Sequence, residues 1–194
     1  RVVEGIAFVR RKKELLGAAK FSTDGEAKEA RELLGKVSRE VDRLTDVTGH
    51  YLQLARRPPA QLAPTELVAL VEDVERLLRP EVEERGARLV VHTAAIPAIP
   101  ADGNQLRQAL INVVRNALEA PAHTITVDLG AEGDAVVLAV RDDGPGMDDT
   151  ALQHATDPFY STKVSGTGLG LAITRQILED HEGSVRIARL PEGG

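Results

Sequence analysis

The 194-residue sequence contains no cysteine, which excludes disulfide scaffolds, thiolate zinc sites and thiol nucleophiles. Aromatic residues make up only 3%, and 30 acidic against 24 basic residues give a net charge of -6. A nucleic-acid groove built from basic side chains and stacked rings is therefore not expected. No apolar run approaches the ~20 residues of a membrane span, and residues 1–16 lack the apolar core and cleavage site of a secretory peptide. We expect a cytoplasmic segment without membrane contact, whose parent protein could be membrane-anchored.

What is present indicates a folded protein. Hydrophobic residues make up 42% and charged residues 28% of the chain, values close to the average of globular proteins. The length suits one domain with an appendage, or two small domains.

Residues 1–57 are helical in character, with a turn at residues 21–25. After this turn, apolar residues recur at steps of three and four, the pattern of a coiled coil or four-helix bundle. They are Leu34, Val37, Val41, Leu44, Tyr51 and Ala55, with Thr48 as a polar interruption. Because two antiparallel helices cannot bury such stripes alone, we expect the hairpin to form a dimeric four-helix bundle. A hairpin packed on its own domain is the alternative.

Pro58 and Pro59 end the second helix and open a linker over residues 58–64. From residue 65 to residue 194 the pattern alternates between helices and strands, which predicts a layered α/β domain. Three helices are expected, over residues 65–85, 102–120 and 168–182. In the first of them we expect Thr65 to be the cap and Leu77 to lie on the buried face. The expected strands are 88–93, a hairpin of 124–129 and 135–142, and 184–190.

Asp142-Asp143-Gly144-Pro145-Gly146 directly follows the strand predicted over 135–142. Glycines let a ligand approach the backbone closely, and a carboxylate at a strand end can accept a hydrogen bond from an exocyclic amine. Alone, such a segment is usually only a turn.

Gly166-Thr167-Gly168-Leu169-Gly170 opens a predicted helix. Such a loop presents unpaired N–H groups and the positive end of the helix to phosphates. A dinucleotide-binding motif is disfavoured, because no strand is predicted before the loop and the spacing lacks the final glycine.

Gln108, Asn112 and Asn116 recur every four residues on the helix predicted over 102–120, so they share one face. Amide oxygens suit a hard cation such as Mg²⁺, which proteins usually hold with few side chains plus nucleotide phosphates.

The order of these elements, with Phe159-Tyr160-Ser161-Thr162-Lys163 between the two glycine segments, resembles the ATP-binding domain of sensor histidine kinases. That domain belongs to the superfamily of gyrase B, the heat-shock chaperone ATPases and the mismatch-repair ATPases. The resemblance covers residues 64 to 190, the short lid is similar to the nitrogen-regulation branch, and residues 1–57 resemble the dimerisation and histidine-phosphotransfer hairpin. It implies an α+β fold class: a helical hairpin followed by a two-layer α/β sandwich of the Bergerat type over residues 65–194.

The resemblance also implies a site for ATP or ADP with Mg²⁺. Asn116 corresponds to the Mg²⁺ ligand, with Asn112 beside it near the phosphates, and Asp142 to the acceptor for the adenine amino group. Gly144 and Gly146 would shape the pocket wall, and Lys163 and Thr167 could reach phosphate oxygens. The phosphate cradle and lid hinge would be formed by Gly166, Thr167, Gly168, Leu169 and Gly170. Phe159 belongs to the box that anchors the lid, where we expect core packing rather than base stacking.

Two positions bear on the reaction. Many kinases of other branches have a basic or aromatic residue three positions after the Mg²⁺ asparagine, where this chain has Glu119. We expect Glu119 to be an exposed helix residue, or else to orient water or a neighbouring side chain. Gyrase-type ATPases place a water-activating glutamate where this chain has Asn112. The resemblance therefore implies phosphotransfer to a histidine, and then to the receiver domain of a response regulator, rather than hydrolysis.

No histidine resembles the family's phosphoacceptor. The five histidines are His50, His92, His123, His154 and His181, and none lies on the first predicted helix with an acidic residue after it. Counting back from the Arg-Pro-Pro segment, the acceptor would fall at or just before Arg1. Two alternatives stay open: the acceptor precedes this chain, or the protein is a nucleotide-binding pseudokinase or scaffold. An anti-sigma serine kinase is a more distant alternative, since it would not need the hairpin.

Overall fold

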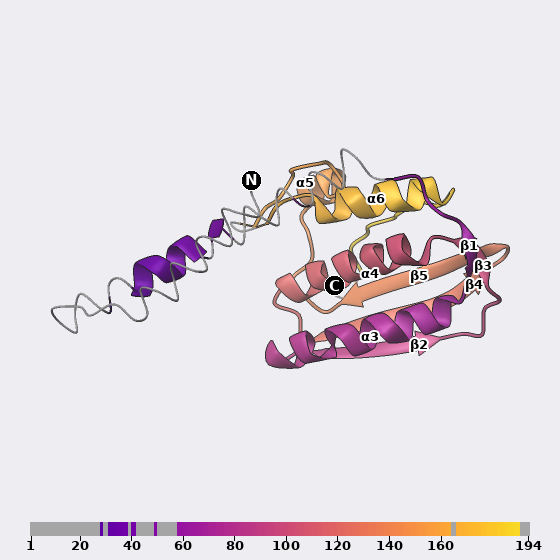
Figure 1. Ribbon diagram of the computed structural model, residues 1–194, viewed down its shortest axis with the longest axis horizontal. Coiled ribbons are helices and arrows are strands. Elements are labelled where there is room, and N and C mark those ends of the chain that lie inside the picture. The colour runs from indigo at the N-terminus through magenta and orange to yellow at the C-terminus, as the bar shows by residue number, and fades with distance from the viewer. Residues whose placement is uncertain are drawn as a thin grey trace. The chain divides into compact units, whose positions relative to one another are not determined.

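The computed structural model describes residues 28, 31–38, 40–41, 49, 58–163 and 166–190. The chain divides into two compact units, residues 1–55 and residues 56–194 (Figure 1). The described residues of the first unit are helical, and the rest of the predicted hairpin lies outside the described residues. Within the described ranges, no helix combines the length and hydropathy needed to cross a membrane.

The main sheet of the second unit has the strand order β2-β4-β5. Its strands are β2 (Arg88–Thr93), β4 (Thr124–Glu132) and β5 (Ala135–Asp142). β2 runs parallel to β4, and β5 runs antiparallel to β4. The tight turn between β4 and β5 contains Gly133 at φ +60°, a conformation that favours glycine. The three predicted strands are confirmed, and β4 extends three residues beyond the predicted end.

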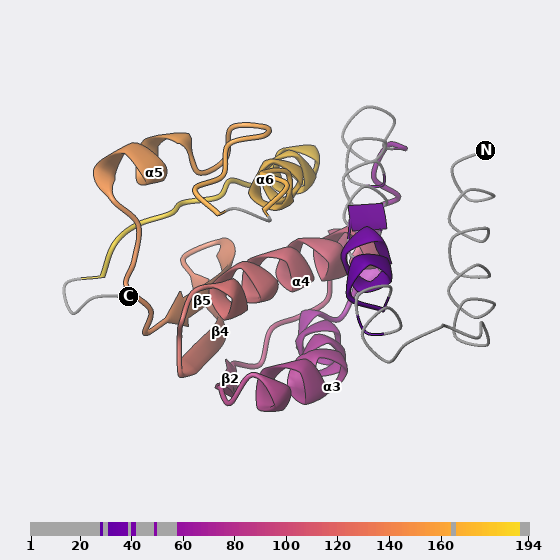
Figure 2. The same ribbon diagram turned by 90° about the vertical axis from the view of Figure 1, so that its left-hand side faces the viewer.

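Helices α3 (Leu67–Glu84) and α4 (Gly103–Glu119) pack against this sheet. Helix α6 (Gly170–Asp180) lies alongside α4, on the side away from α3 (Figures 1 and 2). The core between α3, α4 and the sheet is apolar and includes Val74, Leu78, Val114, Ile125 and Val127. The result is the mixed α/β fold that the sequence predicts.

One residue of the predicted core is placed wrongly. Leu77 is 60% exposed. The buried face of α3 follows four-residue steps through Leu70, Val74, Leu78 and Val82, and Leu77 lies outside this row.

Thr65 does not cap α3 as predicted. It ends the short strand β1 (Ala63–Thr65), which pairs antiparallel with β3 (Ile99–Ala101). Its hydroxyl donates to the carbonyl oxygen of Ala101 at 2.8 Å, and α3 begins two residues later, after Glu66. Two residues of the predicted linker thus belong to a strand.

The strand predicted at Ser184–Leu190 is wrong, since this described segment is in neither sheet. Val185 and Ile187 alternate as in a strand, but strand formation depends on a paired neighbour more than on residue type. The segment is held instead by Arg189, whose Nε donates to the carbonyl oxygen of Met147 at 3.1 Å. Met147 precedes the short helix α5 (Asp149–His154).

Asp102 joins three parts of the second unit. Its Oδ1 accepts from the N–H groups of Asn104 and Gln105 at 3.1 Å each, which caps α4, and its Oδ2 accepts from Gln61 N–H at 3.0 Å. Its own N–H donates to Nε2 of His181 at 2.9 Å. His181 Nδ1 lies 2.7 Å from the carbonyl oxygen of Ile177, so the ring carries its proton on Nδ1. Asp102 therefore ties residue 61 and the end of α6 to the start of α4.

Replacing Asp102 with alanine is expected to lower the free energy of unfolding by about 1–2 kcal/mol at neutral pH, because the helix cap is lost. The N–H of Gln61, followed by those of Gln105 and Asn104, lowers the pKa of Asp102 below its ordinary value of 3.8. The contribution of the carboxylate is thus present above that value and is lost as the pH falls through the folded-state pKa. Urea unfolding over a pH series measures it.

Asp102→Asn is the control: asparagine has one oxygen, which can cap α4, but its amide nitrogen cannot accept from Gln61 N–H. It should keep the contribution of the helix cap at neutral pH and lose the contribution of the Gln61 contact. The difference in free energy of unfolding between the wild type and Asp102→Ala should shrink at low pH. If this difference stayed constant down to about pH 3, the carboxylate would not make the contribution assigned to it.

Candidate nucleotide-binding site

Asn112 connects α4 to the start of α6. Its Nδ2 donates to the carbonyl oxygen of Gly170 at 3.2 Å. The hydroxyl of Thr174 donates to the same carbonyl at 3.0 Å. The structure therefore brings the predicted asparagine helix and the last glycine of the predicted phosphate loop, 58 residues apart, into direct contact.

Asn116 and Lys163 connect α4 to the segment that precedes the glycine loop. The ammonium group of Lys163 donates to Asn116 Oδ1 at 2.9 Å and to the Asn116 carbonyl oxygen at 3.3 Å. It also lies 2.9 Å from Oε2 of Glu119. Glu119 is an exposed helix residue, as predicted, and through this ion pair it also contacts a neighbouring side chain, which is the alternative role predicted for it.

Asp142 ends β5, as predicted, and its Oδ1 accepts from Gly144 N–H at 2.9 Å. A Cβ on Gly144 would lie 2.7 Å from this oxygen and 3.2 Å from the Cβ of Ala120, so a larger residue here would displace the Asp142 carboxylate. Because Ala120 caps the C-terminal end of α4, Asp142 lies beside the end of the helix that carries Asn116. Gly146 has φ +71°.

Asp143 has a structural role that the sequence did not reveal. Its Oδ1 accepts from the N–H groups of His123 and Thr124 at 2.7 and 2.9 Å. The Thr124 bond, followed by the His123 bond, lowers the pKa of this carboxyl. Asp143 thereby fixes the end of β5 against the start of β4. An acidic residue after a strand gives no sequence signal that separates this role from ligand binding.

The backbone of the glycine loop folds back on Phe159 and Tyr160. Phe159 N–H donates to the carbonyl oxygen of Gly168 at 2.9 Å, and both residues have positive φ, +67° and +65°. A Cβ on Gly168 would lie 2.5 Å from both Phe159 C and Tyr160 O, so only glycine fits. The side chain of Phe159 is 59% exposed, so its predicted core packing is wrong.

The remaining loop residues differ in environment. Leu169 is fully buried, so it anchors the loop. The hydroxyl of Thr167 accepts from Leu169 N–H at 3.3 Å. A Cβ on Gly166 would lie 2.3 Å from Oγ of Ser161. Residues 164 and 165 lie outside the described residues.

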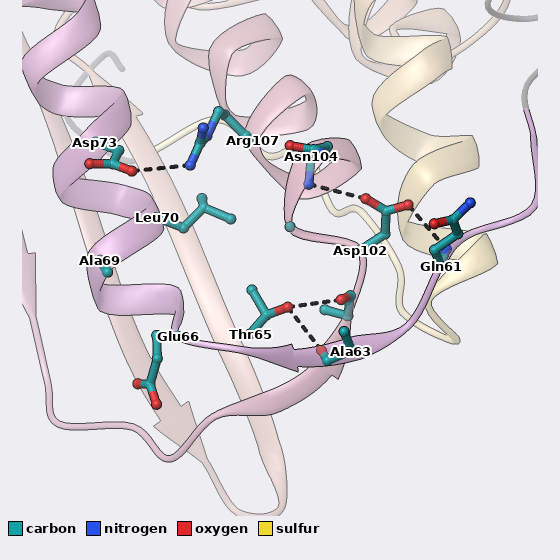
Figure 3. A pocket seen from close by; sticks show the side chains of 12 residues that line it. Gln61, Ala63, Thr65, Glu66, Ala69, Leu70, Asp73, Asp102, Asn104 and Arg107 are labelled. Carbon is teal, nitrogen blue, oxygen red and sulfur yellow. Dashed lines mark hydrogen bonds and ion pairs between the residues drawn. The ribbon is translucent and has the colours of Figure 1, made fainter.

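A separate pocket of about 370 Å³ lies near the N-terminal ends of α3 and α4 (Figure 3). Its lining includes Thr65, Asp102 and the ion pair of Asp73 with Arg107, whose charged groups are 3.1 Å apart. Asn104 also lines it, whereas Asn112 and Asn116 lie in the other half of α4. None of the predicted site residues belongs to this pocket.

Comparison with known proteins places part of the chain in a family. Residues 101–194 match the family described as Histidine kinase-, DNA gyrase B-, and HSP90-like ATPase. The matched region includes every predicted site residue.

Curated relatives cover more of the chain. The sensor histidine kinase TmoS of Ectopseudomonas mendocina is 32% identical over 175 residues, which are 86% of this chain and 18% of TmoS. The sensor histidine kinase ZraS of Klebsiella oxytoca is 33% identical over 181 residues, 91% of this chain and 38% of ZraS. The chain thus spans less than two fifths of either relative.

A solved structure with the same fold is that of full-length ShkA in complex with AMPPNP. It superposes with a TM-score of 0.69 at 27% sequence identity, over 87% of this chain and 36% of ShkA.

Proposed function

Because the chain is a sensor histidine kinase relative of the histidine kinase-, gyrase B- and HSP90-like ATPase superfamily, we propose that it is the catalytic core of a two-component kinase. It binds ATP with Mg²⁺ and transfers the γ-phosphoryl group to a histidine, from which a response-regulator receiver domain takes it. The observation that supports this most is the pair of contacts from Asn112 to Gly170 and from Lys163 to Asn116. The first contact joins the helix proposed to bind Mg²⁺ to the loop proposed to bind phosphates, and the second joins the same helix to the segment before that loop.

The donor chemistry at Asn116 fits a cation. Its Oδ1 already accepts from an ammonium group, and an amide oxygen is a ligand that Mg²⁺ accepts. Asn116 is therefore the proposed Mg²⁺ ligand, and Asn112 lies one helical turn earlier, near the phosphates. When bound, Mg²⁺ would neutralise charge on the phosphate oxygens.

The proposed adenine end is Asp142. Gly144 N–H donates to its Oδ1, which holds the carboxylate in place, and the carboxylate would accept a hydrogen bond from the adenine amino group. Gly144 and Gly146 would leave room for the base. At the phosphate end, backbone N–H groups of the glycine loop and the Lys163 ammonium would meet the phosphate oxygens. The loop residues proposed for this are Gly166, Thr167, Gly168, Leu169 and Gly170. Phe159, exposed beside this loop, would contribute to the lid.

Catalysis by such a site is mainly positioning and charge neutralisation. A glutamate that activates water is not part of this arrangement, since Asn112 has the corresponding position and donates to Gly170. The chain's residues would therefore orient the γ-phosphoryl group toward an imidazole acceptor.

We propose residues 1–57 as the dimerisation hairpin, 58–64 as the linker and 65–194 as the ATP-binding domain. In the single chain Val37 of the predicted apolar stripe is 49% exposed, and Leu34 and Val41 are half-buried, so this part of the stripe has apolar surface that a second copy could bury.

Incubation with γ-labelled ATP and Mg²⁺ tests the proposal. The reaction is run on this chain and on a copy extended upstream of Arg1, with and without a receiver domain. We expect acid-labile label on at least one of the two chains. When the receiver domain is present, the label should pass to it.

A second candidate, a nucleotide-binding scaffold, is favoured by one observation: no histidine of the sequence has the setting of a phosphoacceptor. Absence of label from both chains, with nucleotide binding intact, would establish the scaffold and reject the kinase.

A further inference from the structure

Lys163 reaches across from the loop region to α4 and places its ammonium group among three oxygens. Two belong to Asn116 and one to Glu119. The side chain of Lys163 is 34% exposed and that of Glu119 is 48% exposed. The ammonium group thus makes an ion pair at the edge of the site and a hydrogen bond to the proposed Mg²⁺ ligand.

The Lys163 ammonium group therefore contacts Asn116 Oδ1, the same oxygen atom that would bind Mg²⁺. An ammonium group and a divalent cation compete for Asn116 Oδ1, because like charges at such separations repel. Lysine carries a compact charge on a flexible stem, so it can leave Asn116 without unfolding of α4.

The backbone of Lys163 links the same contact to the glycine loop. Its N–H donates to Oγ of Ser161 at 3.1 Å, and its carbonyl oxygen accepts from Gly166 N–H at 3.3 Å. The Lys163 backbone therefore lies next to the first glycine of the loop.

We propose that Lys163 is an internal cation that occupies the Mg²⁺ ligand of the nucleotide-free site, and that Glu119 is the positioning residue that keeps it there. Binding of a nucleotide with Mg²⁺ moves Lys163 from Glu119 to the phosphate oxygens. The inference rests on the proposed function, because it concerns the same site.

A double-mutant cycle on the affinity for Mg·ADP, measured by calorimetry, tests the inference. Glu119→Gln should tighten binding about threefold, because a partly exposed ion pair of this kind holds the lysine with only modest free energy. In the Lys163→Met background, Glu119→Gln should give no tightening, since there is no lysine left to release.

Glu179→Gln is the matched control. Glu179 pairs with Arg175 on α6 at 2.8 Å, far along that helix from the glycine loop, and its replacement makes the same change of charge. It should leave the affinity for Mg·ADP within about twofold of the wild type.

Two results would overturn the inference while leaving nucleotide binding intact. Unchanged affinity in Glu119→Gln would mean that Glu119 does not retain the lysine. Equal or greater tightening in the Lys163→Met background would mean that Glu119 merely repels the nucleotide. Failure of the wild-type chain to bind Mg·ADP would instead reject the proposed function, and this inference with it.

Discussion

Asn116→Ala is expected to weaken binding of Mg·ADP by at least about 100-fold, since even groups that only support a metal ligand contribute 10–100-fold to metal affinity. The amide Oδ1 is lost, and no other atom of the new side chain can bind a cation. The fold should persist, because alanine is a better helix former than asparagine. Calorimetric titration measures the affinity, and circular dichroism checks the fold.

Asn104→Ala is the matched control, since Asn104 lies on the same helix but lines the separate pocket. Its affinity should stay within about twofold of the wild type, as for most surface substitutions. Retention of affinity by Asn116→Ala would mean that the metal ligand is assigned wrongly.

Gly168→Ala should have the largest effect on the structure of the loop. The new Cβ would lie 2.5 Å from backbone atoms of Phe159 and Tyr160, at a position with φ +65°. Backbone atoms cannot move aside as a side chain can, so we expect a loss of about 2–5 kcal/mol in the free energy of unfolding. Affinity for Mg·ADP should fall by about tenfold or more if the loop shifts to relieve the overlap. Urea unfolding and calorimetry measure the two effects.

Gly170→Ala separates this steric effect from the general effect of losing a glycine. At Gly170 the nearest contact of a new Cβ would be 3.9 Å, to Asn112, and the residue begins α6. Its stability should lie within about 0.5 kcal/mol of the wild type. Equal losses in the two variants would contradict the steric account.

The elements with strong periodicity could be predicted from the sequence. Strands β2 and β5 have the predicted bounds, and α4 lies between the predicted terminal residues Asp102 and Ala120. The short strands β1 and β3 were missed because each has three residues and contains a proline, which local pattern does not identify as a strand. The segment 184–190 shows the reverse error, since alternation alone does not supply a pairing partner.

The residue types of the candidate site could also be predicted, but their pairings could not. Sequence spacing puts Asn112 and Asn116 on one face of a helix, whereas their contacts with Gly170 and Lys163 depend on how α6 packs against α4. The same holds for Glu119, which looks like a solvent-exposed helix residue until Lys163 is seen beside it. Phe159 is exposed and has a positive φ beside Gly168, and a sequence displays neither property.

We propose that this chain binds a nucleotide with Mg²⁺ between α4 and the glycine loop. Calorimetric titration of the wild-type chain with ADP, with Mg²⁺ and then with excess chelator, measures this binding. We expect saturable binding of one nucleotide per chain that weakens when Mg²⁺ is removed. Absence of binding at millimolar ADP, or an affinity that does not respond to Mg²⁺, would contradict it.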